Sequence, residues 1–132
     1  MEFATTVKNI KDVRGKKIAT ILGSIYNINP TLNKKNPPIE VVSCGLKQKD
    51  YKNLDFGGYT CIESDYIYRN YHGKLAVGDM VVFGNAGSYS LVLKPPFILP
   101  NFPVLDISEG KGEVLKRREY FDDLFQTFTF WE

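Results

Sequence analysis

Short apolar runs with a period of two constrain the fold of this chain more than any other feature. The segment Lys16–Leu22 alternates two sets of side chains, and Ile39–Leu46, Met80–Phe83 and Ser88–Lys94 are further β-branched, aromatic or alternating runs. A period of two is that of a β-strand, in which successive side chains point to opposite faces. The sequence therefore predicts strands over these four ranges, in a largely antiparallel sheet.

Residues typical of turns separate these runs. Glycine, proline and asparagine allow the backbone to reverse, and Pro95-Pro96 removes two sheet donors, which must end the strand before it. Such turns at short intervals are typical of an all-β barrel or sandwich. The turn segments are Arg14-Gly15, Leu22-Gly23-Ser24, Asn36-Pro37-Pro38, Gly57-Gly58, His72-Gly73 and Gly110-Lys111-Gly112.

Helical spacing is convincing only near the C-terminus. Phe121, Leu124, Phe125 and Phe128 recur at i, i+3, i+4 and i+7, which predicts one short helix at about Glu119–Gln126. Core packing is the favoured interpretation of this apolar stripe. The alternative is that the stripe, together with Phe130 and Trp131, docks on another domain, because exposed apolar patches often mark interfaces.

Length and composition limit the class of protein. A chain of 132 residues with 43% apolar residues suits one domain with one core. No segment approaches the roughly 20 apolar residues of a membrane helix, and the N-terminus lacks a secretory pattern, so we expect a cytoplasmic protein without a membrane partner. A net charge of +2 argues against a nucleic-acid partner.

The two cysteines differ in their surroundings. Cys44 and Cys61 have neither CxxC nor metal-ligand spacing, so the sequence predicts free thiols and no metal site. Cys44 lies within a β-branched run, which indicates a core residue. Cys61 follows Gly57-Gly58 and has Glu63 and Asp65 nearby. A lone cysteine is usually a small buried apolar residue, but neighbouring carboxylates keep a thiol protonated, which suits a proton donor.

Tyr89 is the second candidate for a functional residue, after Cys61. At the start of the predicted strand over 88–94, it is either a half-buried aromatic residue or a phenol that donates to a phosphate. The preceding Ala86-Gly87-Ser88 permits a tight backbone and offers further donors. His72 lies beside Gly73 in a predicted polar loop, so we expect an exposed side chain without a catalytic role.

The order and spacing of these residues resemble a known family. The pattern GxxCxxxD, then GD, then GxY resembles the second domain of the fold type III pyridoxal-phosphate decarboxylases, the ornithine, diaminopimelate and arginine decarboxylase group. The resemblance extends over essentially the whole chain. The matching segments are Thr6–Ser24, Asn29-Pro30-Thr31-Leu32, Gly58–Asp65, Gly78-Asp79, Gly87-Ser88-Tyr89, Phe97, Pro103 and Lys116–Leu124.

The resemblance implies a mainly β fold, a Greek-key-like β-barrel or sandwich similar to the C-terminal domain of alanine racemase, with one short C-terminal helix. Residues 1–132 would form the C-terminal domain of a two-domain decarboxylase whose N-terminal TIM barrel, which this chain lacks, carries the lysine that holds pyridoxal 5′-phosphate. The implied partners are that barrel, a second subunit in a homodimer and an amino-acid substrate. The isolated domain is expected to be inactive and to bind no cofactor.

The resemblance also implies roles for single residues. Cys61 would donate the proton in the neighbouring subunit's active site, Tyr89 would contact the cofactor phosphate, and Gly87 would lie near the dimer contact. The family usually has an acidic residue directly after the cysteine, whereas this chain has Ile62. Glu63 and Asp65 are the remaining candidates for substrate contact, and a substrate whose far end is not a simple cation, such as a conjugated or carrier-linked amino acid, becomes plausible.

Two functions from other classes stay open at this point. A small β-barrel with aromatic and basic side chains can be an OB-like nucleic-acid-binding module. A strand-rich domain can also serve only as a protein-interaction module. Retention on single-stranded nucleic acid that falls steeply with salt would favour the first, and association with a separately expressed barrel would favour the decarboxylase domain.

Overall fold

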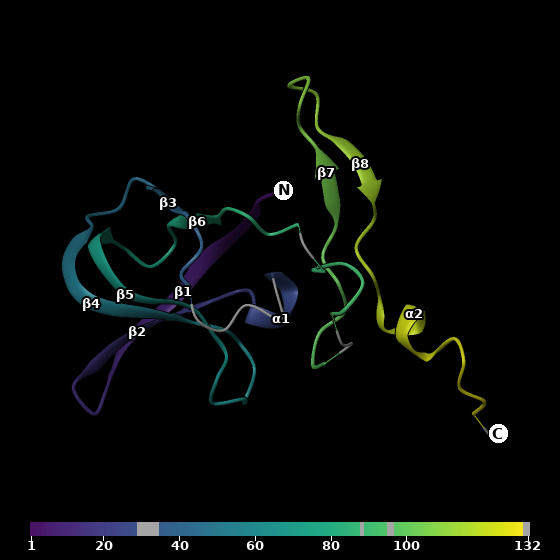
Figure 1. Cartoon of the computed structure of the whole chain (residues 1–132), viewed down its shortest axis with the longest axis horizontal. Coiled ribbons are helices and arrows are strands. Elements are labelled where there is room, and N and C mark those ends of the chain that lie inside the picture. The colour runs from purple at the N-terminus through teal and green to yellow at the C-terminus, as the bar shows by residue number, and fades with distance from the viewer. Residues whose placement is uncertain (29–34, 88, 95–96, 131–132) are drawn as a thin grey trace. The chain divides into compact units, whose positions relative to one another are not determined.

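The computed structural model describes residues 1–28, 35–87, 89–94 and 97–130 (Figure 1). The chain divides into two compact units, Met1–Lys94 and Pro95–Glu132, and each unit is described by itself. The prediction that residues 1–132 form a single domain stays a prediction. In the described part of the chain, neither helix is long and apolar enough to span a membrane.

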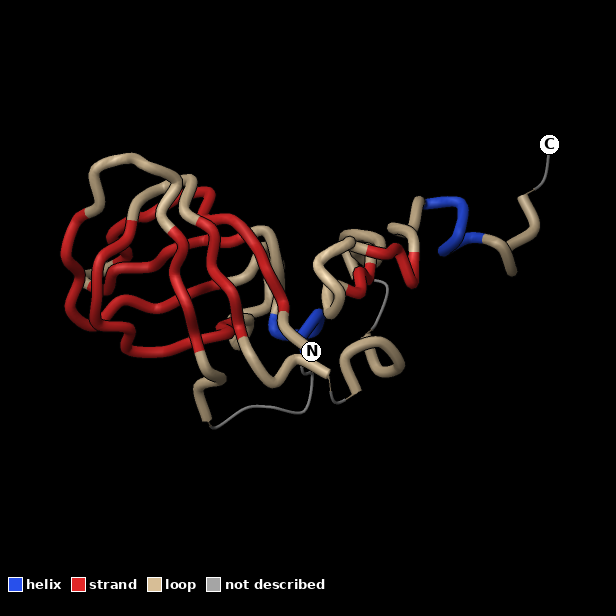
Figure 2. Tube along the Cα trace, turned by 90° about the horizontal axis from the view of Figure 1, so that it is seen from above, coloured by secondary structure: helices blue, strands red, loops and turns tan. Residues whose placement is uncertain are grey.

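The first unit is built around one six-stranded sheet with the order β3-β6-β1-β2-β4-β5. Figure 2 shows its strands curling into a nearly closed barrel, so the predicted mainly β, barrel-like fold is confirmed. The pairings are antiparallel except that β2 runs parallel to β4. The strands are β1 Phe3–Val13, β2 Lys16–Ile21, β3 Ile39–Val42, β4 Lys49–Gly57, β5 Tyr66–Leu75 and β6 Met80–Phe83.

Inward-facing residues of these strands form the core. The ring of Phe56 in β4 packs edge-on against Tyr71 at a centroid distance of 5.3 Å and against Phe83 at 5.9 Å. Burying each such apolar side chain contributes roughly 1.5–3 kcal/mol. Fully buried apolar side chains of the unit include Val7, Ile21, Leu54, Phe56, Leu75, Val81 and Phe83.

A buried carboxylate ties three neighbouring strands together. Asp55 of β4 is buried, and its oxygens lie 3.1 Å from Nζ of Lys16 in β2 and 3.0 Å from the guanidinium of Arg69 in β5. The Arg69 guanidinium also lies 3.5 Å from the ring centroid of Tyr66. These contacts fix the ends of β4 and β5, between which the candidate site is formed.

Two predicted strands in this unit differ from the structure. The predicted strands Lys16–Leu22 and Met80–Phe83 are confirmed as β2 and β6, but β3 ends at Val42 because residues 43–46 form a turn in which Gly45 has φ +87°. Cys44 in this turn is exposed, so its interpretation as a core residue was wrong. A residue beyond the last sheet pairing has no strand neighbour to cover it.

The predicted strand Ser88–Lys94 is also wrong. Ser88 lies outside the described residues, and residues 89–93 form turns in which the amide of Leu93 donates to the carbonyl of Tyr89 at 2.9 Å. Tyr89 has φ +63°, a left-handed conformation outside the β region. His72 is exposed as predicted, but it lies within β5 and not in a loop.

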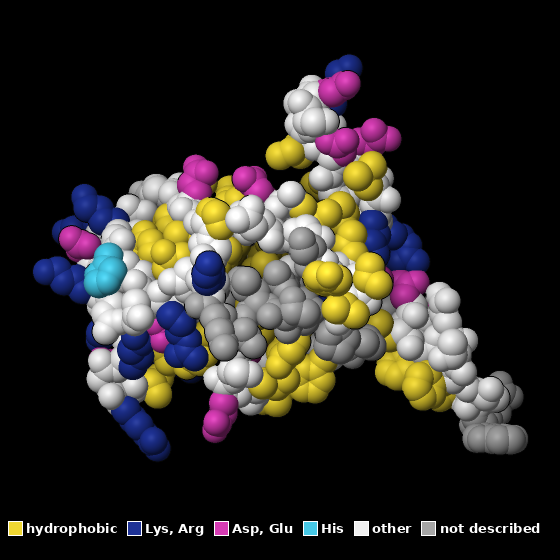
Figure 3. All heavy atoms as spheres, in the orientation of Figure 1, with side chains coloured by type: hydrophobic (Ala, Val, Ile, Leu, Met, Phe, Trp, Pro, Cys, Tyr) yellow, Lys and Arg dark blue, Asp and Glu magenta, His cyan; other side chains and the backbone are white. Residues whose placement is uncertain are grey.

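The second unit consists of a two-stranded hairpin and one helix. Strand β7 (Val104–Asp106) pairs antiparallel with β8 (Glu113–Lys116), and α2 covers Phe121–Phe125. The predicted helix is therefore confirmed with shorter bounds. The favoured interpretation of its stripe as core packing was wrong, because Phe121, Phe125 and Phe128 are exposed; Trp131 lies outside the described residues. Figure 3 shows apolar side chains at the surface along the segment that carries α2.

Candidate active site

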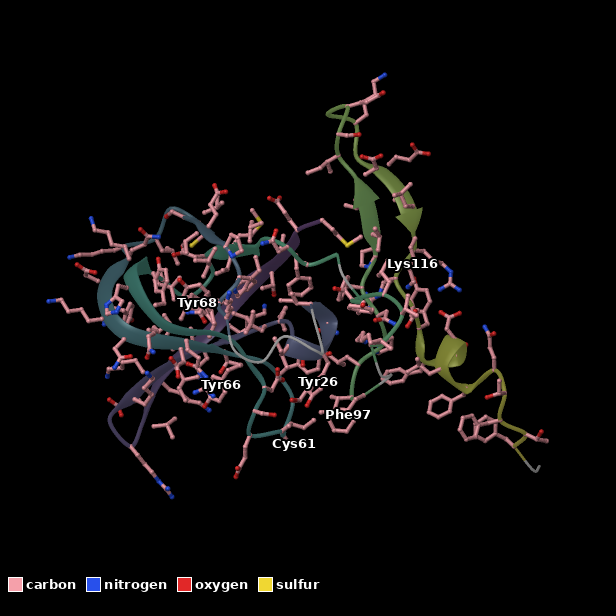
Figure 4. The ribbon with its side chains drawn as sticks, in the orientation of Figure 1. Tyr26, Cys61, Tyr66, Tyr68, Phe97 and Lys116 are labelled. Atoms are coloured by element: carbon pink, nitrogen blue, oxygen red, sulfur yellow. The ribbon has the colours of Figure 1, made fainter. Side chains whose placement is uncertain are left out.

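The loop between β4 and β5, residues 58–65, carries three of the predicted site residues, Cys61, Glu63 and Asp65. We call it the Cys61 loop. The two ends of the loop are joined by a hydrogen bond from the amide of Gly58 to the carbonyl of Asp65 at 2.8 Å. Within the loop, the amide of Asp65 donates to the carbonyl of Ile62 at 3.0 Å. Figure 4 shows Cys61 on this loop, beyond the ends of the strands.

The Cys61 loop is also anchored to the turn that follows β2. The amide of Tyr59 donates to the carbonyl of Gly23 at 3.0 Å. Burial raises the pKa of the half-buried Tyr59 phenol, so this side chain stays protonated at neutral pH. The short helix α1 (Ile25–Ile28) begins directly after the same turn.

Asp65 is the buried centre of this region, with 4% of its surface exposed. Its Oδ1 accepts hydrogen bonds from Oγ of Ser24 at 2.9 Å and from the amide of Ile25 at 2.8 Å. Its Oδ2 accepts from the amide of Thr60 at 3.1 Å and from the Thr60 hydroxyl. A buried carboxylate with donors on both oxygens meets the requirement for burying a charge. We call these residues the Asp65 cluster.

Cys61 itself is exposed. It borders a shallow hollow of about 290 Å³ that is also lined by Lys11 from β1 and by Glu63 and Asp65 of the same loop. Ile62 and Tyr66 also line the hollow. The structure therefore brings a free thiol, one basic and two acidic side chains to the lining of a surface hollow that can receive a polar ligand.

Tyr89 and Gly87 lie on a different loop of the same unit. The Tyr89 side chain is 61% exposed, so its phenol is available as a donor, which is the chemistry that a phosphate needs. The turn that carries it is anchored by the Ser90 hydroxyl, which donates to the carbonyls of Ile28 and Ala86. Neither Tyr89 nor Gly87 lines the hollow beside Cys61.

Gly87 packs close to the start of the chain. A Cβ at this position would lie 3.3 Å from Cβ of Met1, and the amide of the preceding Ala86 donates to the carbonyl of Met1 at 3.0 Å. The local role of Gly87 in this structure is therefore close packing against the N-terminal residue. Its role at a dimer contact stays a prediction.

Gly78-Asp79, the middle element of the sequence pattern, forms a second buried carboxylate centre. Asp79 is fully buried, and it accepts hydrogen bonds from the Ala76 amide at 2.7 Å, the Gln48 side chain at 2.8 Å and the Cys44 amide at 2.9 Å. Burial opposes ionisation, but these donors outweigh it and hold the pKa of Asp79 below its usual value. This centre organises the turns before β4 and before β6.

The sequence did not indicate three residues of the site: Thr60, Ser24 and Lys11. Thr60 and Ser24 are ordinary turn residues in the sequence, and only the fold brings their hydroxyls to Asp65. Lys11 reaches the hollow from β1. Among the residues that the structure describes, no three His, Cys, Asp or Glu side chains are grouped to hold a metal ion.

The sequence of residues 1–87 matches the family model of the pyridoxal-dependent decarboxylase C-terminal sheet domain. The chain belongs to this family. Its members are domains of enzymes that remove a carboxyl group with pyridoxal phosphate. Among curated protein sequences, none shows significant similarity to the chain.

Several solved structures with the same fold are decarboxylases. The chain is similar to diaminopimelate decarboxylase from Helicobacter pylori, solved with L-lysine, with 22% identity and a TM-score of 0.80 over 96% of this chain and 31% of that one. It is similar to the M. jannaschii diaminopimelate decarboxylase, also solved with L-lysine, with 18% identity and a TM-score of 0.82 over 98% and 30%.

A third similar structure is lysine decarboxylase from Selenomonas ruminantium, with 24% identity and a TM-score of 0.57 over 73% of this chain and 25% of that one. The chain thus spans about a third or less of the length of these decarboxylases. At these identities the likeness establishes the fold.

Proposed function

We propose that this chain is the C-terminal β domain of a two-domain, pyridoxal-phosphate-dependent amino-acid decarboxylase similar to diaminopimelate decarboxylase. In this proposal Cys61 donates a proton to the substrate and Tyr89 contacts the cofactor phosphate. The observation that carries the proposal is the exposed Cys61 thiol, held on a hydrogen-bonded loop beside a polar hollow. A buried structural cysteine would not need such a loop.

The side chains fit the parts of the chemistry that the proposal gives them. Pyridoxal phosphate, when bound, withdraws electrons from the bond that breaks as carbon dioxide leaves. The carbon that loses the carboxyl group then needs one proton, and the Cys61 thiol can supply it by general acid catalysis. The exposed side chain can regain the proton from water. The Tyr89 phenol donates to phosphate oxygens through an O–H that is not a charged group.

The remaining parts of the site would come from other polypeptide segments. The proposed partners are an N-terminal barrel with the cofactor-binding lysine and a second subunit in a homodimer. Exposed apolar side chains in both units support such contacts. In the first unit they include Tyr89, Leu91, Val92 and Leu93, and in the second they include Phe121, Phe125, Phe128 and Phe130.

The hollow beside Cys61 bears on the substrate. Ile62, where the family usually has an acidic residue, is half-buried at its wall, while Glu63 and Lys11 bring opposite charges. We propose an amino-acid substrate whose far end is not a simple cation. Both cysteines are exposed and unpaired, which supports a reducing compartment such as the cytoplasm.

The test compares Cys61→Ala with Cys44→Ala in the intact enzyme. Cys61→Ala should retain the cofactor, measured by its absorbance, but should slow turnover by roughly 10²–10⁴-fold, the range for loss of a general acid, or divert the substrate to aberrant products. Cys44→Ala removes the other exposed thiol and should leave turnover unchanged. Full activity and an unchanged product in Cys61→Ala would refute the role of the thiol.

A further inference from the structure

We propose that Thr60 and Asp65 are positioning residues that fix the direction in which the Cys61 thiol is presented. This inference rests on the proposed function, because it gives the Asp65 cluster a role in proton donation by Cys61. Asp65 itself then acts from the interior of the domain, and a neighbouring hydroxyl transmits its effect to the thiol.

The Thr60 hydroxyl links the residues on both sides of Cys61. It donates to Oδ2 of Asp65, and it lies 3.4 Å from the amide of Ile62, which donates to it. The amide of Thr60 donates to the same carboxylate oxygen at 3.1 Å. The residues before and after Cys61 are therefore tied to one hydroxyl, and that hydroxyl is tied to a buried anion.

The anion is itself held in place by the body of the domain. Ser24 and Ile25, at the turn that leads into α1, occupy the other oxygen of Asp65. Rotation of the carboxylate would break hydrogen bonds at a site that is 4% exposed, where water cannot replace them and the unsatisfied group would be strongly unfavourable. The Asp65 cluster thus links the Cys61 loop to a rigid part of the fold.

Positioning matters for proton transfer because its rate depends strongly on donor geometry. A displacement of about 1 Å at a reacting group can cost about 10²-fold in rate. An exposed thiol on an unanchored loop would sample many directions, whereas the Asp65 cluster restricts the backbone on both sides of Cys61. We therefore expect loss of the Thr60 hydroxyl to reduce kcat more than it raises KM.

The Asp79 centre offers a matched control. Asp79 is also buried, accepts a hydrogen bond from the backbone amide of the exposed Cys44, and is also held by a side-chain donor, Gln48. Gln48 does not line the hollow beside Cys61. Gln48→Met therefore removes one donor to a buried carboxylate without touching the proposed site.

The experiment uses the intact enzyme with Thr60→Val, Thr60→Ser and Gln48→Met. Thr60→Val should lower kcat by about 10-fold or more, change KM by less than about threefold, and keep the cofactor. Thr60→Ser, which restores the hydroxyl, should recover most of the rate. Gln48→Met should leave kcat unchanged. In the cofactor-free protein, Thr60→Val should accelerate amide hydrogen exchange within residues 59–64, and Gln48→Met should not.

A double variant separates this inference from the proposed function. If Thr60 acts through Cys61, adding Thr60→Val to Cys61→Ala should cause no further loss of kcat. A slow Cys61→Ala enzyme with a fully active Thr60→Val enzyme would overturn the positioning role alone. A fully active Cys61→Ala enzyme would overturn both. If Thr60→Val does not fold, Ser24→Ala, which removes a donor to the other oxygen of Asp65, should lower kcat in the same direction, and an unchanged kcat would overturn the inference.

Discussion

Gly58 and Asp65 approach each other so closely that a Cβ atom at position 58 would lie 2.2 Å from Oδ2 of Asp65 and 2.4 Å from its Cγ. The carboxylate cannot move aside freely, because both of its oxygens accept hydrogen bonds from Ser24, Ile25 and Thr60. Position 58 therefore requires glycine for reasons of space. The same contact fixes the start of the Cys61 loop against its end.

Gly58→Ala should destabilise the first unit or displace Asp65. Overpacking of this kind typically costs about 1–3 kcal/mol, and movement of the carboxylate would also loosen the Cys61 loop. We expect a lower thermal unfolding temperature and, in the intact enzyme, slower turnover. Gly112→Ala is the control, because a Cβ there meets nothing within 4 Å. Equal unfolding temperatures for the two variants would contradict this account.

The Asp79 centre predicts a defined dependence of stability on pH. Burial raises the pKa of Asp79, but the hydrogen bonds from Gln48, Cys44 and Ala76 together lower it by more. Its folded-state pKa therefore lies below the usual value. A carboxyl with a depressed folded pKa stabilises the fold above its unfolded pKa, which is about 3.9. That contribution is lost as the pH falls through the folded pKa.

Gln48→Met should therefore move acid unfolding to a higher pH. Without the amide donor, the pKa of Asp79 in the folded state rises toward that of the unfolded chain, and less acid is needed to protonate it. Circular dichroism across pH 2–6 measures the midpoint. Gln126→Met makes the same change at an exposed position, where the amide donates to Asp123 over a longer distance of 3.4 Å, and should shift the midpoint less than Gln48→Met does. A Gln48→Met midpoint at the original pH would count against the assignment.

Two strands that pair on both sides, β2 and β6, were predicted correctly from the sequence. β2 and β6 each lie between two neighbours in the sheet, so periodicity and burial agree there. The run at 88–94 alternates equally well, but its apolar residues pair with no strand, and Tyr89 adopts φ +63°. Alternation indicates a strand only where a neighbouring strand exists, and that depends on contacts distant in the sequence.

The candidate site was predictable in part for a related reason. Cys61 was chosen as a candidate from its spacing to Gly58 and Asp65 within one loop, and its catalytic role stays a prediction. The Ser24–Asp65 hydrogen bond joins residues 41 positions apart, so no local pattern could indicate it. Cys44 was misjudged because its β-branched neighbours suggested a strand, whereas Gly45 ends the run in a turn.

The ion pair between Arg117 and Asp123 gives a prediction for the second unit. The two guanidinium nitrogens lie 2.6 and 2.7 Å from the two carboxylate oxygens, and the amide of Tyr120 donates to the carboxylate at 2.8 Å. The Arg117 guanidinium and, after it, the Tyr120 amide hold the pKa of Asp123 well below its usual range. Two parallel hydrogen bonds to one carboxylate need the planar guanidinium group of arginine.

Arg117→Lys should raise the pKa of Asp123 toward the usual value of about 3.9, because lysine keeps the charge but loses one of the two parallel hydrogen bonds. Carboxyl carbon NMR during an acid titration follows this group directly. Arg118→Lys makes the same change at the adjacent residue, whose guanidinium lies 5.5 Å from the Tyr120 ring, and should leave the titration unchanged. Identical Asp123 titrations in both variants would show that the two hydrogen bonds from the Arg117 guanidinium do not cause the low pKa of Asp123.

Tyr89→Phe tests the proposed phosphate contact. Tyr89 sits in a turn with φ +63° and its side chain is 61% exposed, and phenylalanine has the same backbone preferences, so the turn should be preserved. The variant loses only the phenolic donor. A hydrogen bond to a charged group contributes about 1.5–3 kcal/mol, so in the intact enzyme the affinity for pyridoxal phosphate should fall by roughly 10- to 100-fold, measured by fluorescence titration of the cofactor-free protein.

Tyr120→Phe provides the comparison for that measurement. Tyr120 is exposed to a similar extent, 56%, but lies in the second unit, where the sequence pattern predicts no phosphate contact. The affinity of the Tyr120→Phe enzyme for pyridoxal phosphate should equal that of the unmodified enzyme. A general effect of removing a surface hydroxyl would lower the affinity of both variants alike, and an unaltered affinity in Tyr89→Phe would remove this tyrosine from the cofactor site. Only a selective loss in Tyr89→Phe supports a phenol that reaches the phosphate.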